Sequence, residues 1–343
     1  MPKFQSNELI KITRRIFVAA GTPEDIAEIV AGDLVKANLI GYDSHGIWRI
    51  TRYIMRIRNG GLDPEARPEV ERQTNSVAVV NGNWGFGQLG ARMAVEYVSS
   101  LAPKCGVACV ALHRTNHIGR VGEYSEMLAS EGLISMVLTS VTGQDRQVAP
   151  YGGRERIFGT NPMAWALPVR APRPPLVVDF ATSATAEGKL AVALSKGEPI
   201  EPGLVLDRHG NPSTEPKSFF DGGTLLSFGG HKGYGLTLMI QLMTNVLTDY
   251  ENGSYRDSRF KNPSLFTAWS VEAFMAPEQF VDLVEDWLQY IKRSKTAKGF
   301  DEILLPGEPE AKTFAKRSKE GIDIPEPTWR EIMAIAGELG VSI

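Results

Sequence analysis

The sequence lacks the features that mark several common classes of protein. Its 343 residues carry 37 Lys and Arg against 40 Asp and Glu, so there is no basic excess that would favour nucleic-acid binding. No apolar run approaches the ~20 residues that span a bilayer, and no apolar segment like that of a signal peptide follows the first residues. The only two cysteines, Cys105 and Cys109, form neither a disulfide framework nor a zinc pattern. We therefore expect a cytoplasmic protein with reduced thiols, no metal site and no membrane or nucleic-acid partner.

What the sequence does contain is a large apolar fraction and many turn residues. Hydrophobic residues make up 43% of the chain, enough for a substantial core, and 34 glycines are spread along it. Short apolar runs typical of strands cluster between about residues 77 and 228, whereas amphipathic helical patterns dominate both ends. The pattern predicts an α/β protein with helical N- and C-terminal segments.

The stretch from His113 to Gly122 joins a predicted buried strand, 107–112, to a helix-like segment, 123–130. His117 would lie between the two, where α/β proteins commonly place their chemistry. A helix N-terminus favours the neutral imidazole, which can accept a proton from an alcohol. The alternative is a histidine that merely caps the turn, and the local sequence does not separate the two.

Gly85, Gly87 and Gly90 match the pattern G-x-G-x-x-G between a predicted strand, 77–80, and a predicted helix, 91–101. A Rossmann unit also needs an acidic residue about 20 positions further on, at the end of the next strand, to bind the ribose. Here the next strand ends in Leu112-His113-Arg114, without an acid. The sequence therefore argues against a standard Rossmann fold.

Two further glycine-bounded segments carry polar residues suited to a site. Residues 228–235 open a very apolar helix and include His231 and Lys232, so their turn can bind an anionic group or serve only as a tight packing turn. Ser44 and His45 lie between Gly41 and Gly46. Taken alone, that pair favours a capping serine beside a surface histidine.

Together these segments resemble the malate/L-lactate dehydrogenase family of the second type, which also contains ureidoglycolate, sulfolactate and diketogulonate oxidoreductases. The resemblance covers nearly the whole chain. It rests on seven pieces in the family's order: 43–46 (DSHG) with Arg49 and Tyr53, 116–119 (NHIG), 150–153 (PYGG), 159–162 (GTNP), 179–183 (DFATS), 229–235 (GGHKGYG) and 306–309 (PGEP).

The resemblance implies a fold and a reaction. The implied fold is a non-Rossmann α/β fold with a mostly antiparallel central sheet flanked by helices, in a homodimer. On this basis we divide the chain into a helical segment that carries part of the active site (1–75), a sheet-containing cofactor and substrate core (76–275), and C-terminal helices that pack back on the core (276–343). The implied reaction is hydride transfer between NAD(P)H and a small 2-oxo acid, giving a 2-hydroxy acid.

The resemblance also implies the site residues. His117 matches the family's acid/base residue, and His45 with Ser44 matches a pair to which some members assign the proton donor. Arg49 can grip a carboxylate through two hydrogen bonds, and Tyr53 lies near it on the same helix face. Thr160 is a further candidate for binding substrate. For the cofactor the candidates are Gly119, Ser140, Asp179, Phe180, Ala181, Thr182, His231, Lys232, Gly307, Glu308 and Pro309.

Two alternatives remain open at this point. One branch of the family reduces cyclic imines such as piperideine- and pyrroline-2-carboxylate and has an acid just after the glycine that matches Gly188. Lys189 stands there instead, which favours an oxo or hydroxy acid. A non-catalytic nucleotide-binding protein is the other alternative. NAD is slightly preferred as cofactor, although Arg170 and Arg173 can meet the 2′-phosphate of NADP.

Overall fold

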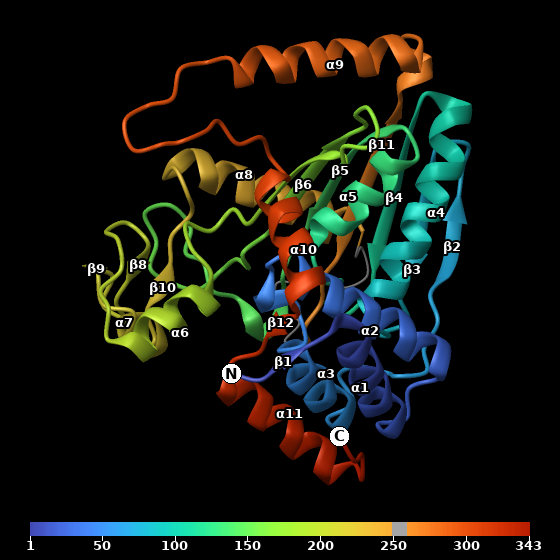
Figure 1. The fold of residues 1–343 in the computed structure, drawn as a ribbon. Helices are drawn as coiled ribbons and strands as arrows, with labels where there is room; N and C mark the ends of the chain where they lie inside the picture. The colour runs from blue at the N-terminus through green and yellow to red at the C-terminus, as the bar shows by residue number, and fades with distance from the viewer. Residues whose placement is uncertain (249–258) are drawn as a thin grey trace.

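The computed structural model describes residues 1–248 and 259–343, and its centre is a seven-stranded sheet (Figure 1). β3 and β4 are parallel because a helix crosses between them, and all other neighbouring strands are antiparallel. The sheet is therefore mixed, and the expectation of a mostly antiparallel sheet needs this correction at β3 and β4. The strands stand in the order β2 (Glu69–Gln73), β3 (Val77–Asn81), β4 (Val107–His113), β11 (Ser264–Ser270), β5 (Leu133–Thr139), β6 (Met163–Leu167) and β7 (Leu176–Phe180).

Helices cover both faces of this sheet. Side chains alternate along a strand, so Val110 and Leu112 of β4 point to one face and Ala111 to the other. The first face is covered by α4 (Gly87–Cys105) and α5 (Val121–Ser130). The second face is covered at one end by α8 (His231–Gln241), which continues into a π-helical turn, η3 (Leu242–Val246). The chemistry-bearing loop between β4 and α5 thus lies at an edge of a three-layer core.

A second core joins the two ends of the chain. β1 (Lys3–Phe4) pairs with β12 (Ile322–Asp323), and both termini lie near this pair in Figure 1. Buried residues of α1 (Ser6–Ala19), α2 (Glu24–Leu39) and α3 (Arg49–Arg58) pack in one cluster with Ile332 and Ala336 of α11 (Glu326–Glu338). A 3-10 turn, η1 (Asp43–His45), connects α2 to α3. The helix that carries Arg49 and Tyr53 is therefore held by residues from both ends of the sequence.

The three-part division of the chain stays a prediction, with two structural observations bearing on its borders. β2 precedes residue 76, so the central sheet takes a strand from the segment 1–75. In the segment 276–343, α10 (Glu308–Glu320) contacts α2 and α11 contacts α3, whereas α9 (Pro277–Lys292) lies along the top of Figure 1 with only Leu288 buried.

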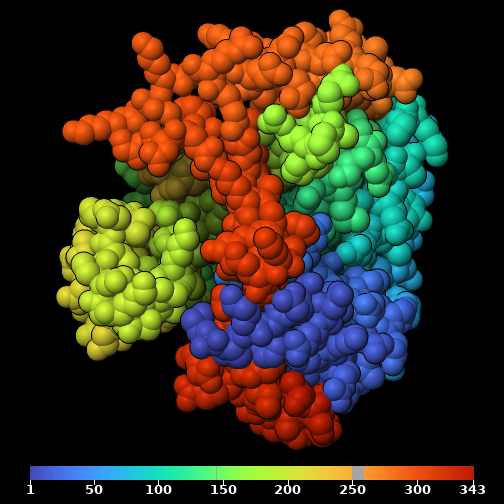
Figure 2. All heavy atoms as spheres, viewed as in Figure 1, coloured from blue at the N-terminus to red at the C-terminus, as the bar shows by residue number. Residues whose placement is uncertain are grey.

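Residues 187–225 form a small lobe beside the sheet. A three-stranded sheet of β10 (Thr224–Leu225), β8 (Val205–Leu206) and β9 (Pro212–Ser213) packs with α6 (Glu187–Lys196) and α7 (Lys217–Phe220) around its own apolar cluster. Figure 2 shows α10 lying between this lobe and the N-terminal helices. Two short 3-10 turns, η2 (Gly143–Asp145) and η5 (Val271–Ala273), follow β5 and β11. Within the described ranges no helix combines the length and apolarity needed to cross a membrane.

The three glycines of the G-x-G-x-x-G pattern are explained by packing. A Cβ at Gly87 would lie 2.4 Å from the carbonyl oxygen of Asn116 and 2.5 Å from that of His117. A Cβ at Gly85 or Gly90 would lie 2.8 Å from Ala66 or Leu112, respectively. The spacing thus lets the start of α4 press against the His117 loop, which places residue 88 beside the histidine.

Candidate active site

His117 lies in the loop between β4 and α5 and is 8% exposed. Two groups contact its Nδ1 atom: the hydroxyl of Tyr53 at 2.7 Å and the backbone N–H of Gly119 at 3.2 Å. A backbone amide can only donate, so Nδ1 accepts and carries no proton. The proton of the neutral ring is therefore on Nε2.

Tyr53 holds His117 through the hydrogen bond to Nδ1. Its side chain is 1% exposed, and its hydroxyl also accepts a hydrogen bond from Nε2 of Gln88 at 3.1 Å. We expected Tyr53 to contact substrate beside Arg49, but its only hydroxyl is occupied by two buried side chains. The i, i+4 spacing places both residues on one side of α3, and the packing of that helix turns Tyr53 inward.

His45 and Ser44 meet His117 from the η1 turn. The two imidazole rings are 5.5 Å apart between centroids and tilted by 32°, and Ser44 Oγ lies 3.0 Å from His45 Nδ1. Asn38 shapes this turn by accepting from the N–H of Ile47 at 2.8 Å. A Cβ at Gly46 would lie 2.1 Å from Asn38 Oδ1, so the turn requires glycine. The structure therefore brings together two histidines that are 72 positions apart in the sequence.

Three arginines line one side of α3 next to the histidines. Arg56 pairs with Asp145 at 2.8 Å, and Arg52 pairs with Glu187 at 3.4 Å. Arg49 donates from Nε to the carbonyl of Ser44 at 2.7 Å and forms no ion pair within the described part of the chain. It is the arginine whose charge remains available for an anion.

The surroundings of both histidines favour the neutral imidazole. Burial, followed by the charge of Arg49, holds the pKa of His117 well below its ordinary value. The same two causes, with Arg120, lower the pKa of His45 to about 3. Burial also lowers the pKa of Arg49, to about 10. Burial and nearby arginines thus favour a neutral imidazole at both positions, whereas the sequence suggested a helix N-terminus as the cause.

Asp179 forms an ion pair at the start of α5. Its Oδ2 lies 3.2 Å from Nε of Arg120 and accepts from the backbone N–H of Gly122 at 2.9 Å. A Cβ at Gly122 would lie 2.6 Å from the same oxygen. Burial raises the pKa of Asp179, and Arg120 opposes that rise. The carboxylate proposed for cofactor binding is thus engaged within the protein, where it fixes the His117 loop through Arg120.

Arg120 and Tyr42 were missed from the sequence. The guanidinium of Arg120 lies 5.0 Å from the ring centre of Tyr42, and that ring is 6.4 Å from His45. Arg120 directly follows the matched Gly119, so its position beside the motif was the available signal. Tyr42 precedes the matched 43–46 segment in the same way. The two link the His117 loop to the His45 turn.

The candidate residues at the end of β7 meet the glycine-rich turn before α8. Thr182 donates through its backbone N–H to the carbonyl of Thr160 at 2.9 Å and accepts from the N–H of Phe228 at 3.0 Å. Phe180 and Phe228 lie edge to face at 5.6 Å and are both partly exposed. Ala181 is half-buried between Phe180 and Thr182. Thr160 is therefore joined to the expected cofactor residues, and its hydroxyl is half-buried beside them.

His231 and Lys232 begin α8 and are exposed. The preceding Gly229 and Gly230 have positive φ angles of 58° and 62°, and a Cβ at Gly229 would meet no atom within 4 Å. Ser227 Oγ is buried without a hydrogen-bond partner in the described chain. A helix N-terminus with open backbone N–H groups, a lysine and an unsatisfied hydroxyl fits a phosphate group.

The last cofactor candidates lie elsewhere around β7 or deeper in the core. Ser140 is fully buried, and its hydroxyl is bonded to Thr244 at 2.8 Å. Gly307 has a φ of 88° and lies at the start of β7, where a Cβ would be 3.6 Å from the nitrogen of Val177. Glu308 accepts from Lys292 at 2.7 Å, and Pro309 is the second residue of α10. The expected residues thus border both ends of β7, whereas the Ser140 hydroxyl is used internally.

Other charged groups considered from the sequence are paired. Arg170 forms an ion pair with Asp282, and Arg173 lies 3.5 Å from Glu285, both acids being on α9. In the described ranges, no three His, Cys, Asp or Glu side chains are grouped as for a metal ion. The clustered functional side chains are therefore the two histidines, the serine and Arg49.

Comparison with known proteins identifies related sequences over almost the full length. The malate/L-lactate dehydrogenase family matches residues 4–333. The L-sulfolactate dehydrogenase of Methanothermobacter thermautotrophicus is 35% identical over 99% of this chain and 98% of that protein. The malate dehydrogenase of Pyrococcus abyssi is also 35% identical, over 99% of this chain and 95% of that protein.

Solved structures show the same similarity. The sulfolactate dehydrogenase of Methanocaldococcus jannaschii superposes with a TM-score of 0.89 and 33% identity, covering 99% of this chain and 98% of that one. A Δ1-piperideine-2-carboxylate reductase from Pseudomonas syringae gives a lower TM-score of 0.83 with 29% identity, over 98% and 100% of the two chains.

Proposed function

The chain belongs to the malate/L-lactate dehydrogenase family and is an oxidoreductase of hydroxy acids, and we propose that it acts on small 2-oxo and 2-hydroxy carboxylic acids at His117, His45 and Arg49. One observation carries the assignment of the site. Two neutral histidines lie 5.5 Å apart beside an arginine that has no acid partner in the described chain. An anion-binding cation next to an acid/base group is what a 2-hydroxy acid requires.

The proposed roles follow from the contacts. Arg49 binds the substrate carboxylate and so fixes the neighbouring carbon, while Nε of the same guanidinium stays anchored on the Ser44 carbonyl. His117 exchanges a proton with the substrate oxygen. We propose that His45, held by Ser44, contacts the bound substrate beside His117 and excludes water from it. The nicotinamide, when bound, supplies or takes the hydride.

We propose that a dinucleotide binds along β7. In this arrangement the turn before His231 and Lys232 binds a phosphate of the cofactor. Phe180, Ala181 and Thr182 contact one of its planar rings. Gly307, Glu308 and Pro309 bind the opposite end of the dinucleotide. Gly119 allows the cofactor to approach His117. Ser140 and Asp179 do not contact the cofactor in this proposal but hold neighbouring segments, Ser140 through Thr244 and Asp179 through the His117 loop. We propose NAD rather than NADP, because Arg170 and Arg173 already pair with acids of α9. We also propose that no Rossmann unit is used, since Gly85, Gly87 and Gly90 are closed by packing.

The imine-reducing alternative has weaker support in the structure. Lys189, which stands where that branch has an acid, is exposed at the start of α6. The nearby acid Glu187 already accepts from Gln147 at 2.6 Å and pairs with Arg52. No acid therefore remains here for a protonated imine nitrogen within the described contacts.

A substrate panel tests the proposed function. We expect NADH-dependent reduction of a small 2-oxo acid, followed at the NADH absorbance band, with slower turnover of cyclic imines and of NADPH. The panel includes oxaloacetate, sulfopyruvate and pyruvate, together with piperideine- and pyrroline-2-carboxylate. Binding of NADH without turnover of any oxo acid or imine would instead support a non-catalytic nucleotide-binding protein.

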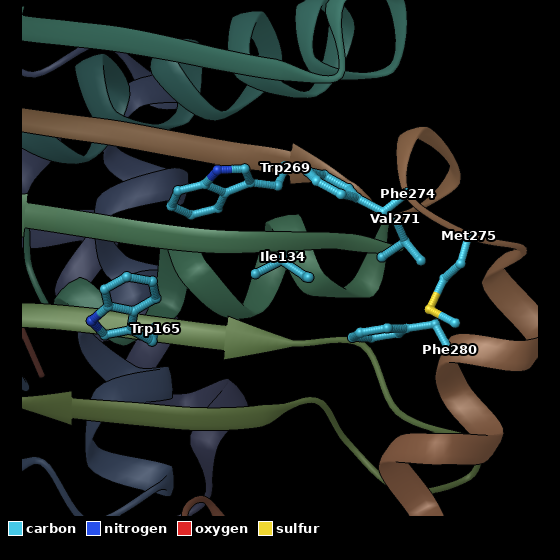
Figure 3. Close-up of a pocket in the computed structure, with 7 residues that line it drawn as sticks. All are labelled: Ile134, Trp165, Trp269, Val271, Phe274, Met275 and Phe280. Atoms are coloured by element: carbon cyan, nitrogen blue, oxygen red, sulfur yellow. The ribbon is translucent and has the colours of Figure 1, made fainter.

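We further propose that two copies of the chain associate through the sheet face that α8 leaves open. Figure 3 shows Trp165 and Trp269 projecting from β6 and β11 on this face, with Phe280 of α9 at the other end of the same pocket, near Met275. The two indoles stack at 5.9 Å, and a cavity of about 340 Å³ lies beside them. Large exposed apolar patches mark association sites. Exposed apolar residues of this sheet face, of the turn after β11 and of α9 are Val77, Val107, Trp165, Phe274, Leu283, Trp287 and Tyr290.

The homodimer predicts a result for a single charged substitution. Trp287 is 65% exposed, so Trp287→Glu is expected to leave the subunit folded and to convert a dimer into a monomer. Light scattering coupled to gel filtration measures the mass, and circular dichroism checks the fold. A wild-type monomer at micromolar concentration would refute the proposal.

We also propose a cytoplasmic location. It is supported by the free thiols of Cys105 and Cys109, which form no disulfide in the described chain.

A further inference from the structure

A chain of three buried side chains ends on His117. Gln88 Nε2 donates to the hydroxyl of Tyr53 at 3.1 Å, and that hydroxyl donates to His117 Nδ1 at 2.7 Å. Gln88 is completely buried within the G-x-G-x-x-G segment that packing, rather than phosphate binding, explains. In this arrangement His117 Nε2 carries the proton. The ring can then donate a hydrogen bond to a substrate but cannot accept a proton at Nε2.

The unused oxygen of Gln88 provides a second arrangement. Gln88 Oε1 is buried and has no hydrogen-bond partner in the described ranges. A half-turn of the amide places this oxygen against Tyr53, whose hydroxyl then donates to Gln88 and accepts from a protonated Nδ1. Nε2 is then free to accept a proton. Either orientation leaves one amide atom unpaired, so the second arrangement has fewer hydrogen bonds only by the Gly119 contact to Nδ1.

We propose that Gln88 is a positioning residue that selects, through Tyr53, which ring nitrogen of His117 carries the proton. The proposal rests on the acid/base role proposed above for His117. In oxidation, the substrate O–H bond breaks and a bond from that proton to Nε2 forms, while the hydride leaves the adjacent carbon for the nicotinamide and a carbonyl is produced. Reduction reverses the same bonds, so both directions require Nδ1–H donating to Tyr53.

The surroundings of His117 make such an acceptor important. Arg49, Arg52 and Arg56 of α3 and His45 of η1 face the ring, and all of them disfavour its protonation. Asp33 of α2 acts on Tyr53 rather than on the ring. The Gly119 N–H, at 3.2 Å the longer of the two contacts to Nδ1, is lost when that nitrogen is protonated. When the Tyr53 hydroxyl donates to Gln88, its oxygen can accept from Nδ1–H and so stabilises the protonated nitrogen.

Two substitutions of Gln88 separate a positioning role from a structural one. Gln88→Met keeps the length but offers Tyr53 no acceptor, so the acid limb of kcat/KM for hydroxy-acid oxidation is expected to move about one pH unit lower, with a plateau about tenfold lower. An ionised Gln88→Glu offers only acceptors, so the limb is expected to move about one unit higher. Loss of packing alone would not move the limb in opposite directions.

The controls use Tyr53 itself and one other buried tyrosine, Tyr124. In a Tyr53→Phe background the difference between the Met and Glu variants is expected to vanish, because the link to His117 is removed. Tyr124→Phe deletes another buried hydroxyl, which donates to the Ile118 carbonyl in the same loop, and is expected to leave the pH limb in place. Shifts of the same sign in both Gln88 variants, or none in either, would overturn the inference.

A readout that does not require turnover distinguishes this inference from the proposed function. Nitrogen-15 NMR of the histidines in the intact protein reports which ring nitrogen is protonated. We expect His117 to be protonated at Nε2 in the wild type and to gain the Nδ1–H form in Gln88→Glu. An unchanged tautomer in Gln88→Glu would refute the role of Gln88 whatever the activity. Absence of oxo-acid turnover in the wild type would refute the proposed function alone.

Discussion

Replacing His117 by alanine is expected to lower kcat about 10³-fold, within the range contributed by general acid/base catalysis. The imidazole is buried, its Nδ1 atom is held by Tyr53 and Gly119, and Arg49 lies beside it. Without the ring, no group with comparable positioning can exchange a proton with the substrate oxygen. Steady-state kinetics with the best substrate of the oxo-acid panel measures the loss, and NADH titration shows whether cofactor binding is retained.

The same experiment decides between the two histidines. His45→Ala is expected to reduce kcat by a smaller factor, because its Nδ1 contact is Ser44 on an exposed turn rather than a buried chain. His209→Ala serves as the control, since that histidine lies in an exposed loop next to Arg208. A larger loss for His45→Ala than for His117→Ala would move the proton-transfer role to His45.

Replacing Arg49 by methionine is expected to lower kcat/KM about 10²- to 10³-fold, mostly through KM, because a buried charge-assisted contact to the carboxylate is lost. Methionine keeps much of the side-chain volume and removes the charge. Arg49→Lys restores the charge without the planar fork and is expected to recover only part of the loss. Arg49 is well suited to this role because its neighbours Arg52 and Arg56 already have acid partners.

A matched substitution on the same helix provides the control for Arg49. Arg58 pairs with Glu338 at 2.7 Å at the surface, where both side chains are about half exposed. Arg58→Met is therefore expected to leave kcat/KM unchanged, since exposed ion pairs contribute little. Equal KM values for wild type and Arg49→Met would exclude Arg49 from carboxylate binding.

Local sequence patterns predicted the elements around the site well. The apolar run before His113 is β4, and the helical spacing after Gly122 is α5, because period-2 and period-3.6 patterns reflect burial directly. The missing acid after the G-x-G-x-x-G segment argued against a standard Rossmann unit, and in the structure these glycines lie in close packing contacts. What the pattern could not supply was the orientation of the crossover, which makes β3 and β4 parallel in a mixed sheet.

The roles of single side chains were harder to predict, because they depend on contacts between distant segments. The spacing of Arg49 and Tyr53 indicates a shared helix side but not that the hydroxyl of Tyr53 is buried under His117. Asp179 lies where a strand ends, yet its ion pair with Arg120 is 59 positions away in sequence. Gln88 carries no signal of its own, since its importance comes from one unpaired buried oxygen.

The packing of α11 against α3 has a consequence for the order in which the protein can mature. Ile50, Tyr53 and Ile54 of α3 share their apolar cluster with Ile332 and Ala336 of α11. During synthesis, α3 emerges early from the ribosome, whereas α11 follows only after the whole central sheet has been translated. A nascent chain thus contains both histidines long before the α11 residues that pack in the same cluster as Tyr53. Catalytic competence is therefore expected only after α11 has been translated, so a product truncated between β11 and α11 would contain every proposed catalytic residue and still be inactive.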